Sequence, residues 1–111
     1  MAAKAFIEHG MSTTIIEIDP AVYRFARKHF EFPEPTEVYL EDARDWVRRR
    51  AGDVRSLQTS SLEQAEVQLF DYVVHDCFSG GGVPQHLYTL EFWEDLKAVM
   101  HPSGVIGVVS Y

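Results

Sequence analysis

Short apolar runs alternate along this chain with segments in which apolar residues recur at helical spacing. The runs are rich in β-branched residues, as in strands that are buried on both faces of a sheet. They occupy residues 13–18, 37–40, 70–75 and 105–109. The helical segments are residues 2–8, 20–30, 43–51 and 89–100. Because strand–helix–strand connections are right-handed, this strict alternation predicts an α/β fold with a parallel sheet between helices.

Residues with strong capping preferences mark the ends of the predicted helices. Gly10 suits the C-terminal end of the first helix. Asp19 can cap the second helix, and Pro20 fits its first turn. Thr89 can cap the last helix, and Gly52 is predicted to stop the third.

Two of these helices carry their apolar residues on one face. In the second helix the face consists of Val22, Phe25, Ala26 and Phe30. In the last helix it consists of Phe92, Trp93, Leu96, Val99 and Met100. Residues 53–66 are polar and predict a long surface loop inside a single domain of residues 1–111.

Charge and cysteine content narrow the possible partners and location. Acidic residues outnumber basic ones by 17 to 10, and the net charge of −7 repels phosphate backbones, so no nucleic-acid partner is predicted. The single cysteine, Cys77, excludes a disulfide within the chain and favours a reducing, cytoplasmic location. No run approaches the roughly 20 apolar residues of a membrane span, so no membrane partner is predicted.

Carboxylates follow three of the predicted strands, at the edge where parallel α/β sheets bind ligands. Glu17 can bind both hydroxyls of a ribose or lie at a solvated strand end, whereas Asp19 is interpreted as a helix cap. Asp42 can accept a hydrogen bond from an adenine amino group or cap the next helix. Asp76 can orient or deprotonate an amine nucleophile, or it can cap a loop.

A glycine-rich loop follows Asp76. Gly80 to Gly82 lack the spacing of a dinucleotide fingerprint and are interpreted as a flexible loop that can serve as a lid. His75, Cys77 and His86 match no established zinc spacing and lack a fourth ligand. No metal site is therefore predicted.

Five stretches of the chain form a combined pattern. They are residues 16–20, 41–43, 70–76, 87–93 and 102–105. Together they resemble the spermidine synthase family, the polyamine aminopropyltransferases. The resemblance implies the class I S-adenosylmethionine-dependent methyltransferase fold, a Rossmann-like parallel sheet with flanking helices.

The resemblance also implies a role for each matching residue. Glu17 would bind the ribose hydroxyls of the cofactor, and Asp42 would bind its adenine amino group with Ala43 beside it. Asp76 would be the catalytic aspartate that handles the attacking amine. The donor would be decarboxylated S-adenosylmethionine, which releases methylthioadenosine.

Two parts of the family pattern differ in this chain. Nothing matches the family's central first strand and its glycine-rich loop, so the resemblance implies an incomplete fold, truncated at its N-terminus. The strands at Ile15 and Val73 would then lose the neighbour between them. In the substrate loop, which includes Ser79, Gly80 and Gly81, Ser79 stands where the family has a second acid.

The resemblance predicts group transfer to a small-molecule amine, impaired by the truncation, and two alternatives stay open. A methyltransferase needs the same ribose and adenine contacts but not the second acid, and it would convert S-adenosylmethionine to S-adenosylhomocysteine. A non-catalytic remnant or partner-binding domain needs no cofactor loop. The exposed strand edges could be completed by a second copy of the chain, which would give a homo-oligomer.

Overall fold

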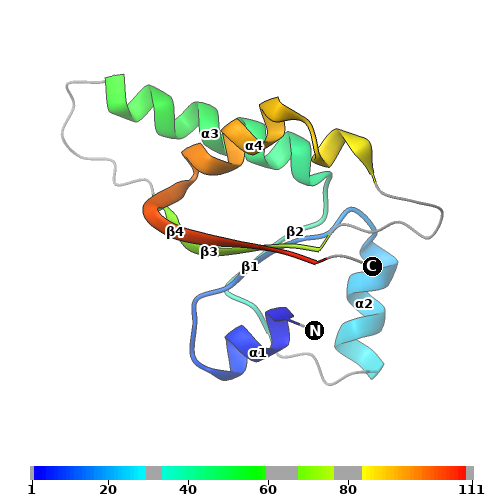
Figure 1. The fold of residues 1–111 in the computed structure, drawn as a ribbon. Coiled ribbons are helices and arrows are strands. Elements are labelled where there is room, and N and C mark those ends of the chain that lie inside the picture. The colour runs from blue at the N-terminus through cyan, green and yellow to red at the C-terminus, as the bar shows by residue number, and fades with distance from the viewer. Residues whose placement is uncertain (1, 30–33, 60–67, 77–83, 110–111) are drawn as a thin grey trace. The chain divides into compact units, whose positions relative to one another are not determined.

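The computed structural model describes residues 2–29, 34–59, 68–76 and 84–109 (Figure 1). The chain divides into two compact units, Met1–Ala43 and Arg44–Tyr111, which are treated separately below.

The first unit contains two helices and one pair of strands. Helix α1 spans Ala2–Glu8, strand β1 Thr14–Ile16, helix α2 Pro20–His29 and strand β2 Glu37–Tyr39. Strands β1 and β2 are parallel, and Ile16 is the register partner of Tyr39. This pair is the scaffold on which the first group of candidate site residues lies.

Backbone geometry at Gly10 ends helix α1 as the sequence predicts. Gly10 has a φ of 79°, in the left-handed region that favours glycine. Its N–H donates to the Ile7 carbonyl at 2.9 Å, and the Met11 N–H donates to the Phe6 carbonyl at 3.0 Å. These two bonds form a Schellman motif, so the predicted C-terminal cap is confirmed.

The predicted apolar face of helix α2 is only partly buried. Ala26 is buried, but Val22 and Phe25 are 52% and 55% exposed. Phe30 lies outside the described residues. Helical spacing thus reports amphipathicity but not whether another element covers the face.

The second unit places two helices on one side of a strand pair (Figure 1). Its elements are α3 Ala43–Thr59, β3 Phe70–His75, the 3₁₀ turn η1 Gln85–Leu87, α4 Leu90–Ala98 and β4 Met100–Val108. The first residue of α3, Ala43, is also the last residue of the first unit. Strands β3 and β4 are parallel, and Tyr72 is the register partner of Val105. The buried core side chains are Trp46, Val47, Ala51, Val54, Leu87, Phe92, Leu96, Val99 and Met100.

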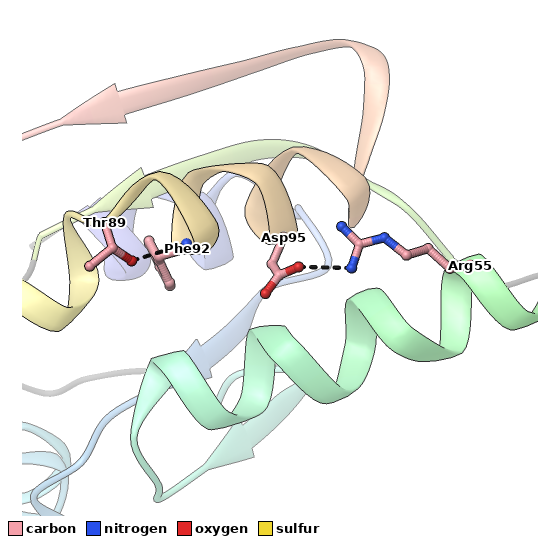
Figure 2. A network of polar contacts seen from close by, with 4 residues as sticks. All are labelled: Arg55, Thr89, Phe92 and Asp95. Atoms are coloured by element: carbon pink, nitrogen blue, oxygen red, sulfur yellow. Dashed lines mark hydrogen bonds and ion pairs between the residues drawn. The ribbon is translucent and has the colours of Figure 1, made fainter.

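Helix α3 is longer than the sequence predicts. It passes through Gly52 and ends at Thr59, so residues 53–59 of the predicted loop are helical. Val54 is buried, and Arg55 forms an ion pair with Asp95 of α4 at 2.8 Å (Figure 2). These contacts favour the additional turns over the stop expected at Gly52. The remainder of the predicted loop lies outside the described residues.

The strands also differ from a single continuous sheet. In the described parts of the chain they form two separate parallel pairs, β1–β2 and β3–β4. The α/β class with parallel strands and flanking helices is confirmed, and each unit holds one parallel pair.

Strand β4 begins earlier than predicted. The structure assigns it to Met100–Val108, so residues 100–104 extend the predicted strand of residues 105–109 at its start. Its register with β3 is irregular between Phe70 and Tyr72, and this irregularity accommodates the Pro-Ser-Gly sequence.

Across the described segments, every helix is too short or too polar to cross a lipid bilayer. The cytoplasmic location stays a prediction.

Candidate functional site

Glu17 lies directly after strand β1 and is held there by two hydrogen bonds. Its N–H donates to the Tyr39 carbonyl of β2 at 3.0 Å, and its Oε1 accepts from the Asp19 N–H at 3.1 Å. The residue is half-buried. The carboxylate is therefore fixed at the carboxyl end of a parallel strand, the position from which such folds bind ribose.

Asp19 acts as the cap of helix α2. Its Oδ1 accepts a hydrogen bond from the Ala21 N–H at 2.9 Å, and the residue is exposed. Pro20 is the first residue of the helix, as predicted. The capping interpretation of Asp19 is confirmed.

Asp42 and Ala43 lie at the start of helix α3, after strand β2. Because β1 and β2 run in the same direction, the segment after Tyr39 leaves the strand pair at the same edge as Glu17. Both Asp42 and Ala43 are half-buried. The structure thus brings Glu17 and Asp42 to one edge of the first unit, while Asp42 also occupies the N-cap position that its alternative interpretation requires.

Asp76 follows the last residue of strand β3 in the second unit and is exposed. The substrate-loop residues Ser79, Gly80 and Gly81 lie outside the described residues. The predicted site residues therefore fall into two groups, Glu17, Asp42 and Ala43 in one unit and Asp76 in the other.

His75 is the residue that sequence reasoning undervalued. The sequence pattern presents it only as a candidate metal ligand, but it is buried and lies against the rings of Tyr88, Phe92 and Trp93. Its Nε2 is 2.8 Å from the Leu87 carbonyl oxygen. The available signal was a histidine at the end of a buried strand, directly before the candidate catalytic aspartate.

Two polar contacts fix helix α4, which carries Phe92 and Trp93. The Thr89 hydroxyl accepts from the Phe92 N–H at 3.2 Å and caps the helix, as predicted (Figure 2). One turn further along, the guanidinium of Arg55 pairs with Asp95 and ties α4 to α3 (Figure 2). The rings of Phe92 and Trp93, which contact His75, therefore lie on a capped helix that is joined to α3.

Metal ligation has no structural support within the described ranges. There, no three His, Cys, Asp or Glu side chains gather in a way that could hold an ion. Cys77 falls outside these ranges.

Comparison with known proteins gives two clear relatives. The chain is 39% identical over 104 residues to an N-terminal histidine N-methyltransferase of Emericella nidulans, a match that covers 94% of this chain and 17% of the relative. It is 34% identical over 94 residues to a polyamine aminopropyltransferase of Vibrio vulnificus, a match that covers 83% of this chain and 27% of the relative. No protein-family profile and no solved structure matches the chain.

Fold and relatives together define a partial class I methyltransferase fold, and both relatives are transferases by name. More particularly, the resemblance to spermidine synthase-like proteins is confirmed, because one relative is itself a polyamine aminopropyltransferase. Both relatives use S-adenosylmethionine or its decarboxylated form as the donor of the transferred group. The chain spans less than a third of either relative's length.

Proposed function

We propose that this chain is part of a transferase domain that moves a carbon group from an S-adenosylmethionine-type donor to an amine nitrogen. The observation that carries the proposal is the shared edge of the β1–β2 pair, where Glu17 and Asp42 both lie. Two carboxylates after neighbouring parallel strands suit the ribose and the adenine of one nucleoside.

Glu17 is the ribose ligand in this proposal. An ionised carboxylate only accepts hydrogen bonds, so it complements a ribose diol, which donates two. The hydrogen bond from the Asp19 N–H orients the carboxylate before the ligand arrives. Asp42 and Ala43 would contact the adenine, with Asp42 accepting from its amino group.

Asp76 is the catalytic residue in this proposal. The donor supplies a carbon bonded to a positively charged sulfur. As the amine lone pair attacks this carbon, the carbon–sulfur bond breaks and its electrons remain on sulfur. The attacking nitrogen must lose a proton, and the Asp76 carboxylate can orient the amine and accept or relay that proton. Its exposed position after β3 leaves it accessible to an amine.

Methyl transfer is the second candidate within the same chemistry. Ser79 replaces the acid that holds a cationic polyamine in the spermidine synthase family, and one relative is an N-methyltransferase. An α-amine, such as that of an N-terminal histidine, is then the acceptor. A partner-binding domain without catalysis is the rival class.

The first test is calorimetric titration of the purified chain with methylthioadenosine and S-adenosylmethionine. Binding is measured before turnover because this sequence has no match to the glycine-rich loop. We expect Glu17→Gln to weaken binding by about tenfold or more, since it removes charged hydrogen bonds to the ribose. Asp19→Asn is the matched control, because it also removes one charge but retains a side chain that caps helices well.

The outcomes separate the candidates. Equal binding by wild type and Glu17→Gln, or no binding by a folded chain, would reject the nucleoside site and favour the partner-binding alternative. If binding follows the expected order, product analysis distinguishes the two transfers. Release of methylthioadenosine with putrescine indicates aminopropyl transfer, whereas release of S-adenosylhomocysteine with a peptide that begins with histidine indicates methyl transfer.

A further inference from the structure

The tautomer of His75 follows from its hydrogen bond. Nε2 lies 2.8 Å from the carbonyl oxygen of Leu87, and a carbonyl oxygen only accepts. Nε2 therefore carries the proton in this contact. In the neutral ring, Nδ1 is then left with a lone pair that can accept a hydrogen bond.

Among the residues that the structure describes, Nδ1 of His75 has no hydrogen-bond partner, although His75 is only 3% exposed. Buried polar atoms in native proteins are almost always paired with protein, water or ligand. If His75 served only to bind the Leu87 carbonyl, its buried second nitrogen would destabilise the fold without contributing an interaction. The orphaned atom therefore indicates a partner that is bound during function.

The surroundings of the ring indicate the chemistry of that partner. The ring centroids of Tyr88 and Trp93 lie 4.6 and 4.9 Å from that of His75, and both residues are half-buried. Aromatic faces attract cations. Asp76, the next residue in the chain, adds an exposed carboxylate. An acceptor nitrogen, two aromatic rings and a carboxylate together favour a cationic or neutral amine that donates N–H.

We propose that His75 is a specificity-determining residue of the amine site, and that its Nδ1 accepts a hydrogen bond from an N–H of the acceptor amine beside Tyr88 and Trp93. This rests on the proposed function and deepens it, because it identifies the residue that recognises the acceptor. Asp76 then handles the proton of the attacking nitrogen, while His75 binds and orients the amine group.

The decisive measurement is long-range proton–nitrogen correlation NMR of the histidine rings in the complete chain, labelled with ¹⁵N. Putrescine and histidinamide are the probes, because each carries an amine of one candidate acceptor. We expect the His75 Nδ1 resonance to begin in the position of an unprotonated, unbonded nitrogen and to move saturably as amine is added. His101, which is exposed and bonds to Ser103 in the same unit, is the internal control and should not move.

Two variants separate the role of His75 and its neighbours in amine binding from their role in holding the fold together. His75→Gln retains a donor that can reach the Leu87 carbonyl but removes Nδ1, and Trp93→Leu removes one aromatic wall. For His75→Gln we expect amine binding about tenfold weaker or more, because a hydrogen bond to a charged group is lost. The thermal midpoint and the affinity for methylthioadenosine should stay close to those of the wild type.

Several results would overturn the inference. In the first, neither amine moves the His75 Nδ1 resonance. In the second, the resonance without amine already has the position of a hydrogen-bonded nitrogen, because a buried water is its partner. In the third, His75→Gln binds amine as tightly as the wild type. The wild-type spectrum decides the question even if a variant does not fold. Failure of the proposed function can be told apart from failure of this inference. A chain that binds amine at His75 but neither binds nucleoside nor transfers a group would support this inference and contradict the proposed function.

Discussion

At Gly104 of strand β4 the surrounding atoms leave little space for a side chain. A Cβ built there would lie 3.0 Å from two backbone carbonyl oxygens, those of Asp71 and His101, and 3.0 Å from the Met100 side chain. Backbone oxygens cannot rotate away as a side chain can. The close approach of these two oxygens therefore favours glycine at this position.

Gly104→Ala should destabilise the chain by about 1–3 kcal/mol, the range for overpacking a well-packed site. Gly107→Ala in the same strand is the matched control, because nothing lies within 4 Å of its built Cβ. It should be neutral or stabilising by up to about 1 kcal/mol. Urea unfolding of both variants measures the difference, and equal midpoints would contradict the tight contact at Gly104.

At the scale of the element, helix α3 continues past Gly52, although the local sequence predicts that it ends there. Gly52 is exposed inside the helix, and nothing lies within 4 Å of its built Cβ. The only described glycine with a positive φ is Gly10. Gly52 is therefore an ordinary helix-interior glycine, while Gly10 is a true C-terminal cap.

Gly52→Ala should stabilise the chain by about 0.5–1 kcal/mol, since alanine loses less backbone freedom on folding in a helix. Gly10→Ala should have the opposite sign and cost about 1 kcal/mol or more, because its φ of 79° strains any other residue. Thermal unfolding followed by circular dichroism compares them. A loss of stability in Gly52→Ala would mean that the helix ends at Gly52, as the sequence alone predicts.

At the scale of the whole molecule, apolar side chains remain exposed in both units. In the first unit they include Val22 and Phe25, and in the second the register partners Tyr72 and Val105, each 57% exposed. Two-stranded pairs also expose backbone hydrogen-bonding groups at their edges. We propose that these edges and faces are covered by a second copy of the chain.

The apparent mass in light scattering should therefore rise with protein concentration. Val105→Lys should reduce this rise, because a charge on the face opposes close strand contact, whereas Val105→Thr should preserve it as a β-branched control of similar size. A wild-type chain that stays a well-folded monomer at every concentration would contradict self-association.

Much of the candidate site was accessible from local pattern. The caps formed by Asp19 and Thr89, and the hydrogen bond that orients the Glu17 carboxylate, depend on residues two or three positions away. Interactions of this range are readable in a sequence because both partners lie in the same short window. The roles of Glu17, Asp42 and Asp76 in binding and catalysis remain predictions, since they concern ligands rather than the chain itself.

The sequence by itself therefore determined the α/β class, the order of elements, the glycine cap of α1 and the capping of α2 and α4. Only the tertiary structure decided that α3 continues past Gly52, that the strands separate into two pairs, and that His75 is buried with one nitrogen unpartnered. The physical reason is distance along the chain: Arg55 pairs with a residue 40 positions away, and the Nε2 of His75 with one 12 positions away. Contacts of this kind depend on how separate elements pack, and no local periodicity encodes that packing.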